Sequence, residues 1–94
     1  MKLRFEWDEQ KAQVNLAKHR VSFLTAAGIF ENETIERIDE REDYGETRFI
    51  ALGRVDSNIY RVVFTLRSEN LIRIISAQKA GRDERETYYG AILP

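Results

Sequence analysis

The second half of the chain contains three segments that alternate apolar and polar residues. They cover about 47–55, 59–66 and 71–77, and short polar breaks at 56–58 and 67–70 separate them. Alternation with a period of two is typical of strands with one buried face, and such breaks favour tight reversals. The last segment is rich in isoleucine on both faces, which indicates a central strand. Together the three segments predict an antiparallel meander.

Further predicted elements precede and follow this meander. The periodicity and the capping residues predict two more strands and three helices, at 2–7, 34–38, 9–20, 23–30 and 82–92. In the first helix we expect Ala12, Leu16 and Val14 to form the apolar side. The predicted fold class is α+β: a small antiparallel sheet packed by two N-terminal helices and one C-terminal helix, in a single domain over residues 1–94.

Composition excludes several classes of function. The 94 residues are 43% hydrophobic and 33% charged, with a net charge of -1, so a broad basic coat for nucleic-acid binding is absent. There is no cysteine and only one histidine, so we expect no disulfide, no metal site and no cofactor. No apolar run is long enough for a membrane span or a signal peptide, and we therefore expect a cytoplasmic protein.

The first predicted helix carries a stripe of polar side chains. Lys11, Asn15, Lys18 and His19 follow the spacing i, i+4, i+7, i+8, which places them on one helical face. This face is either ordinary solvated surface or an arrangement that meets an anion. His19 lies at the end of the helix, where it either satisfies the last carbonyls or transfers protons, as the imidazole side chain commonly does in catalysis. Trp7 is most simply a core residue, with base stacking as the minor alternative.

The sequence resembles a known family along almost its whole length. The residues that carry this resemblance are FEWD..K...N..KH.VSF from Phe5, and later RIISA.KA...E...Y, which ends at Tyr88. In this combination the chain is similar to the BrnT toxins of type II toxin–antitoxin pairs. The resemblance implies a RelE-like fold, endoribonuclease activity, translation inhibition and a cognate BrnA-type antitoxin with a ribbon-helix-helix segment. It also implies that the toxin–antitoxin complex binds operator DNA.

Three positions depart from the family pattern. Arg20 replaces the usual glycine after KH, Gly81 replaces a small hydroxyl residue before the last helix, and Gln78 stands where relatives have arginine. Gln78 matters most, because a neutral amide cannot hold a phosphate as a guanidinium does. Either activity is weaker, or Lys79 or Arg82 compensates.

Metal-free RNA cleavage needs proton-transfer groups and cations around the scissile phosphate. The residues that we expect to act in catalysis are Arg61, Arg73 and His19, and those that we expect to bind substrate are Arg48, Ser76, Lys79 and Arg82. Arg73 interrupts an apolar strand, which indicates either a phosphate site or a buried ion pair with a carboxylate such as Glu31 or Glu84. We expect Arg61, in the preceding strand of the hairpin, to lie close to Arg73. Like charges on neighbouring strands repel unless an anion lies between them, and this favours a phosphate site.

Other interpretations remain open at this stage. Lys11 and Asn15 are more readily structural or antitoxin-contacting than catalytic. The acidic run 36–46 is a solvated loop by default, although in a toxin it could bind a basic antitoxin segment or move aside for substrate. The alternative function is a catalytically attenuated protein, which holds an antitoxin and contributes to an operator-binding repressor complex.

Overall fold

The computed structural model describes residues 2–93 and contains the expected order of elements. In chain order these are β1 Arg4–Glu6, α1 Glu9–His19, α2 Phe23–Ala27, the 3-10 turn η1 Gly28–Glu31, β2 Thr34–Ile38, β3 Phe49–Val55, β4 Asn58–Ser68, β5 Leu71–Lys79 and α3 Arg82–Ile92. The segment predicted as a helix over 23–30 is therefore a short helix followed by η1. No helix in the described part of the chain is long and apolar enough to cross a membrane.

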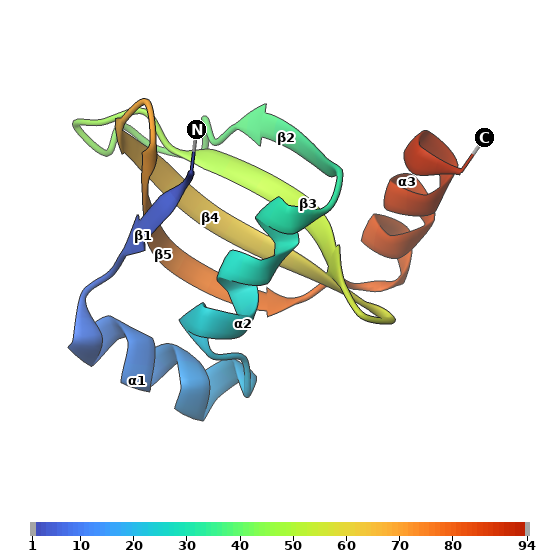
Figure 1. Cartoon of the computed structure of the whole chain (residues 1–94), viewed down its shortest axis with the longest axis horizontal. Helices are drawn as coiled ribbons and strands as arrows, with labels where there is room; N and C mark the ends of the chain where they lie inside the picture. The colour runs from blue at the N-terminus through green and yellow to red at the C-terminus, as the bar shows by residue number, and fades with distance from the viewer. Residues whose placement is uncertain (1, 94) are drawn as a thin grey trace.

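The five strands form one sheet in the order β1-β5-β4-β3-β2 (Figure 1). The four strands β2 to β5 pair antiparallel, which confirms the predicted meander. In contrast, β1 adds to the edge of β5 in parallel, through pairs such as Glu6 with Arg73, so the sheet is mixed. The orientation of β1 could not be predicted, because its partner strand lies more than sixty residues away along the chain.

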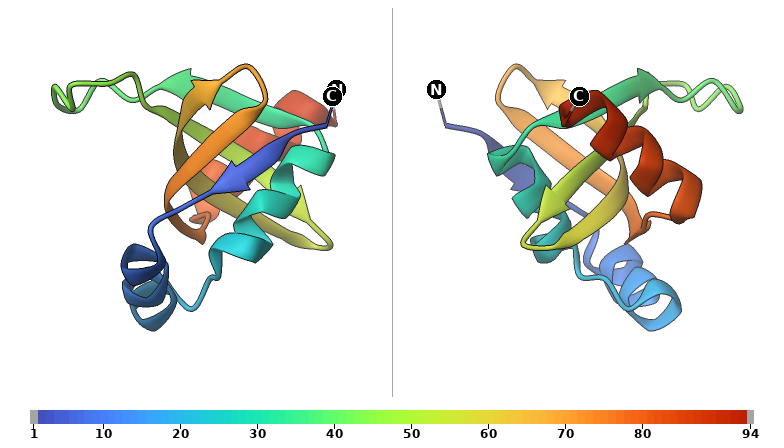
Figure 2. Two further views of the ribbon diagram at one scale, coloured as in Figure 1. Left: turned by 60° about the vertical axis from the view of Figure 1, so that its left-hand side comes forward. Right: turned by 90° about the vertical axis from the view of Figure 1, so that its right-hand side faces the viewer.

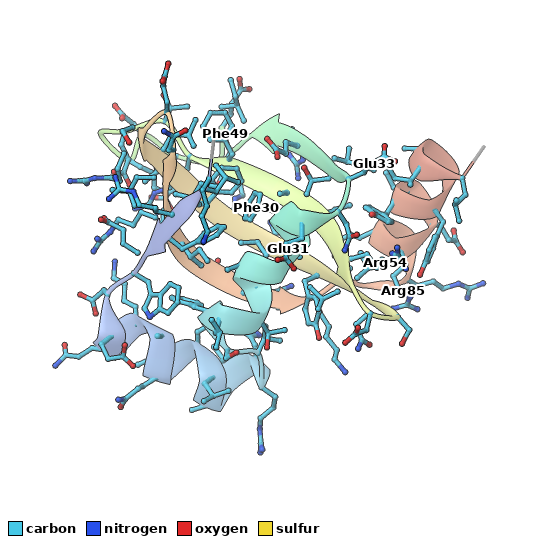
Figure 3. The ribbon with its side chains drawn as sticks, in the orientation of Figure 1. Phe30, Glu31, Glu33, Phe49, Arg54 and Arg85 are labelled. Carbon is cyan, nitrogen blue, oxygen red and sulfur yellow. The ribbon has the colours of Figure 1, made fainter. Side chains whose placement is uncertain are left out.

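The sheet has a different covering on each face (Figure 2). On one face α2 and η1 pack over the main core, which includes the cross-strand row Ala51, Val62 and Ala77. Phe30 and Phe49 extend this core, as Figure 3 shows near β3. On the opposite face α3 covers one end of the sheet. Its buried residue Tyr88 packs there in a second cluster with Leu52, Ile59 and Ala80.

The buried side of α1 differs from the prediction. Val14 and Leu16 are 65% and 48% exposed, whereas Asn15 is only 7% exposed. The Asn15 side-chain amide donates to the carbonyls of Val21 and Ala77, at 3.0 and 2.8 Å, and its oxygen accepts from the N–H of Ala77 at 3.1 Å. Asn15 therefore supplies the hydrogen bonds that a neighbouring strand would give to the free edge of β5, and it fixes α1 against that edge.

Candidate active site

At least four arginines lie on the face of the sheet that α3 covers at one end, and Arg67 adjoins them, because its Nε lies 3.9 Å from the Glu6 oxygen that also binds Arg73. Arg61 pairs across the strands with Leu52 and Gln78, and the next row on this face contains Arg37, Ile50, Val63 and Ser76. A third row contains Arg73 beside Thr65, and Arg48 directly precedes the paired residue Phe49. We call this surface, defined by Arg37, Arg48, Arg61 and Arg73, the arginine face.

Arg61 is held by a carboxylate from α3. Its Nε lies 3.3 Å from Oε2 of Glu84, and its side chain is 16% exposed. The same glutamate accepts a hydrogen bond from the N–H of Gly81 through Oε1, at 2.9 Å. Glu84 therefore links the start of α3 to Arg61 on the sheet, and it is not the partner of Arg73.

Arg73 is ion-paired, but with neither of the two expected glutamates. Its Nη1 lies 2.7 Å from Oε2 of Glu6, the residue that faces it across the parallel β1–β5 pair. The expected ion pair with a carboxylate is therefore present, but the partner is neither of the two glutamates named as examples, because the pairing of β1 with β5 was not predicted. The Arg73 side chain remains 35% exposed, so it is available to a ligand on the arginine face.

Arg61 and Arg73 do not lie next to one another. Arg61 faces Gln78 whereas Arg73 faces Thr65, and these positions are five residues apart on β5, a distance of roughly 16 Å at about 3.3 Å per residue. The expectation that they lie close together is therefore wrong. Ser76 lies between them on the same face, because a bulge between Val63 and Phe64 shifts the register by one residue.

Arg48 is held by an ordered loop. Its guanidinium lies 4.1 Å from the ring centroid of Tyr44, and its Nε is 3.0 Å from Glu46. Tyr44 in turn donates to the buried carboxylate of Asp39, which also accepts two side-chain bonds from Arg41 at 2.8 and 2.7 Å. Those bonds from Arg41 hold the pKa of Asp39 well below its usual range, and burial raises the pKa of Tyr44.

Arg37 is a candidate that the sequence analysis missed. It lies in the same row as Ser76 and lines a groove of about 240 Å³ between α3 and the sheet, together with Glu84. Within residues 2–93 its side chain makes no hydrogen bond or ion pair, unlike the side chains of the other three arginines. In the sequence it is hidden inside the acidic run, and only the strand register reveals its position.

His19 lies in a separate groove of about 440 Å³, where α1 meets the edge of β5. The lining includes Lys11, Lys18 and His19 from the polar stripe, and Ser76 from β5. Ser76 is therefore shared between this groove and the arginine face. The structure brings the only histidine near one end of the arginine face, although it shows no direct contact of His19 with an arginine.

The structure brings neither Lys79 nor Arg82 to the arginine face. Lys79 pairs with Tyr60, whose side chain belongs to the core on the other face, so Lys79 cannot replace the missing guanidinium at Gln78. Arg82 is 83% exposed and bonds Glu86 at 3.3 Å. It is two positions from Glu84 on α3, which places it on roughly the opposite side of that helix.

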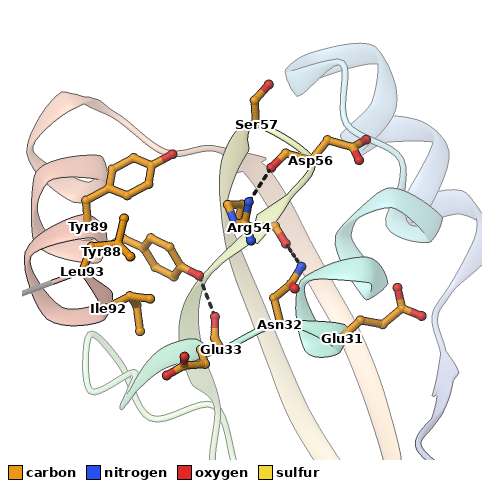
Figure 4. A pocket seen from close by; sticks show the side chains of 10 residues that line it. All are labelled: Glu31, Asn32, Glu33, Arg54, Asp56, Ser57, Tyr88, Tyr89, Ile92 and Leu93. Carbon is orange, nitrogen blue, oxygen red and sulfur yellow. Dashed lines mark hydrogen bonds between the residues drawn. The ribbon is translucent and has the colours of Figure 1, made fainter.

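The largest groove, of about 730 Å³, lies at the far end of the molecule (Figure 4). It is bounded by Tyr88 and Tyr89 of α3, by the β3–β4 turn and by the connection from η1 to β2. The Tyr88 hydroxyl donates to the carbonyl of Glu33 at 2.8 Å, and Asn32 donates to that of Arg54 at 2.8 Å. Because its charged lining is mostly acidic, this groove is a poor candidate for an RNA site.

Comparisons with known proteins agree with this description. A family model described as "Ribonuclease toxin, BrnT, of type II toxin-antitoxin system" matches residues 7–84, a range that includes the polar stripe and the four arginines. The chain is also similar to the crystal structure of the Brucella abortus ribonuclease toxin BrnT, with a TM-score of 0.65 and 24% sequence identity. That likeness covers 86% of this chain and 100% of the other, and it shows the fold. No curated protein matches the sequence.

Proposed function

Since the chain belongs to the BrnT family of ribonuclease toxins of type II toxin–antitoxin systems, we propose that it cleaves RNA at the arginine face without a metal ion. The observation that carries this proposal is the gathering of four arginines on one face in a chain of net charge -1. Three of them are paired to glutamates that a phosphate can replace, and Arg37 has no such partner among residues 2–93. Guanidinium groups suit phosphate geometry.

In the proposed reaction the arginines stabilise the charge that develops on phosphorus. Arg61 and Arg73 act from two sides of Ser76, and Ser76 donates a hydrogen bond to a phosphate oxygen. His19, which shares a groove with Ser76, transfers a proton. Arg48 holds the RNA beside Arg73, whereas Lys79 and Arg82 meet only RNA that extends beyond the arginine face.

Substitution of single arginines tests this assignment. We expect Arg61→Ala or Arg73→Ala to reduce RNA cleavage by about 100-fold or more, because each removes a charge aimed at the transition state. Both variants should relieve the growth arrest that induced expression causes. Arg54→Ala is the matched control, since Arg54 is exposed and lines the distal groove. Cleavage by Arg61→Ala and Arg73→Ala at the rate of the Arg54→Ala variant would show that the site is elsewhere.

A type II toxin implies a cognate antitoxin. We propose a BrnA-type partner with a ribbon-helix-helix segment, whose complex with this chain binds operator DNA. The support is the family membership together with the FEWD..K...N..KH.VSF motif. Co-expression of the protein encoded beside this gene should restore growth, and the purified complex should shift a DNA fragment from its own promoter. If cells remain growth-arrested when the neighbouring protein is co-expressed, the proposed partner is wrong.

One observation favours the second candidate function, an attenuated toxin that mainly holds its antitoxin. Gln78 lies directly opposite Arg61, and Lys79 faces the other side of the sheet. If the amide attenuates cleavage, Gln78→Arg should raise the rate of RNA cleavage by adding a cation beside Arg61. An unchanged rate in this variant would remove the reason for calling the toxin attenuated.

A further inference from the structure

RNA cleavage needs a group that removes the proton from the ribose 2′-hydroxyl, and Glu84 occupies a suitable position. It lines the groove of about 240 Å³ between α3 and the sheet, where Ile35, Ile50 and Leu52 form apolar walls. Its side chain is 34% exposed, so a ligand in the groove can reach the carboxylate. No other acidic side chain is ion-paired to Arg61 within residues 2–93.

A hydrogen bond and an ion pair fix the orientation of this carboxylate. The N–H of Gly81 holds Oε1 at 2.9 Å, as in the capping box at the start of α3. Arg61 holds Oε2 at 3.3 Å, which is the longer of the two contacts. If a phosphate binds Arg61 through a bidentate contact, Arg61 would release Oε2 of Glu84. Oε1 of Glu84 would remain bound to the N–H of Gly81 at the start of α3. The oxygen that becomes free would then lie beside the ribose of the bound phosphate.

We propose that Glu84 is the general base of the cleavage reaction, an inference that rests on the proposed function and assigns its missing base. The Glu84 carboxylate takes the proton of the 2′-hydroxyl as the 2′-oxygen forms a bond to phosphorus. The bond from phosphorus to the 5′-oxygen breaks, and the leaving oxygen receives a proton from a water molecule. The products are a 2′,3′-cyclic phosphate and a 5′-hydroxyl, and the protonated Glu84 gives its proton to the hydroxide that remains, which restores the carboxylate.

The charged groups that face Glu84 come from two strands. Arg61 approaches from β4, and Glu36 and Arg37 line the groove from β2. The groove therefore contains the base and one cation, Arg37, and a second cation, Arg61, contacts the base from β4. If Glu84 only caps α3 and supports Arg61, it needs an oxygen that accepts hydrogen bonds but does not need to transfer a proton.

The test compares Glu84→Gln with Asp83→Asn, in the full chain, on a defined RNA oligonucleotide across a range of pH. Glutamine retains an oxygen that accepts from Gly81, whereas Asp83 is exposed in the same helical turn and loses an equal charge. We expect Glu84→Gln to cleave at least about 100-fold more slowly and to lose the acidic limb of the pH–rate profile. Asp83→Asn should keep the wild-type rate and pH–rate profile. In a Glu84→Ala variant, added formate supplies a carboxylate in place of the missing side chain and should partly restore cleavage.

The outcomes separate this inference from the proposed function. If the wild type leaves the RNA intact, both fail together. If the wild type cleaves and Glu84→Gln cleaves at the same rate with the same pH profile, only the role of Glu84 is overturned. A slower Glu84→Gln variant that keeps the wild-type pH profile, with no rescue of Glu84→Ala by formate, would make Glu84 a positioning residue and would equally overturn the proposal.

Discussion

At the scale of single residues, Asn15 shows how a polar stripe can be structural. The stripe on α1 has four positions. Lys11, Lys18 and His19 line a groove, whereas the amide of Asn15 is buried against β5. The spacing alone could not separate these roles, because it places all four side chains on one helical face. The prediction that Asn15 is structural holds, although its partner Ala77 is 62 residues away and no local pattern identifies it.

Loss of the Asn15 amide should destabilise the protein strongly. Asn15→Ala leaves the N–H and C=O of Ala77 and the carbonyl of Val21 without their partner in a buried position. We expect the free energy of unfolding to fall by about 2–4 kcal/mol. Urea denaturation measures this, with Gln13→Ala on the exposed side of α1 as the control. Equal urea midpoints for Asn15→Ala and Gln13→Ala would contradict the conclusion that Asn15 fixes α1 against β5.

The buried carboxylate of Asp39 predicts a dependence of stability on pH. Because the folded state lowers its pKa through bonds from Arg41, Asp39 stabilises the protein above the unfolded pKa of roughly 3.9. This contribution is lost as the pH falls below that value. Asp39→Asn should therefore unfold at lower urea than the wild type at pH 7, with a smaller difference at pH 3. The exposed Glu40→Gln should show neither effect, and a pH-independent deficit in Asp39→Asn would contradict the assignment.

At the scale of elements, the strands and α3 could be predicted well and α1 could not. Alternation and short turns located the meander to within a few residues, because each strand of it buries one or both faces. In α1 the apolar residues Val14 and Leu16 face solvent, since the helix covers a strand edge rather than the core. A strand edge presents backbone polar groups, so it is satisfied by an amide and not by aliphatic side chains.

The packing of η1 on β3 depends on a glycine. A methyl group at Gly53 would lie 2.5 Å from Cβ of Ile29, which is fully buried. We expect Gly53→Ala to lower the free energy of unfolding by about 1–3 kcal/mol, because the core must shift to admit it. Gly90→Ala in α3 has nothing within 4 Å and should instead stabilise by about 0.5–1 kcal/mol. Chemical denaturation measures the free energy of unfolding of both variants. A Gly53→Ala variant as stable as the wild type, or a Gly90→Ala variant less stable than it, would contradict the prediction.

At the scale of the whole molecule, the arginine face depends on register. Ser76 and Arg73 are three residues apart, a spacing that places side chains on opposite faces of a regular strand. The bulge opposite Val63 brings both to one face. The sequence therefore could name Arg61, Arg73 and Ser76 as candidates, but it could not place them, and it missed Arg37 because that residue lies within an acidic run.

Cleavage of a defined RNA by the purified chain in excess EDTA tests the central claim most directly. A protein that uses only its own arginines and proton-transfer groups should cleave at the same rate with and without the chelator. It should leave a 2′,3′-cyclic phosphate, and a single 2′-deoxy substitution at the cleaved nucleotide should abolish the reaction. Loss of cleavage in EDTA that added Mg²⁺ restores, or unchanged cleavage of the 2′-deoxy substrate, would contradict the account.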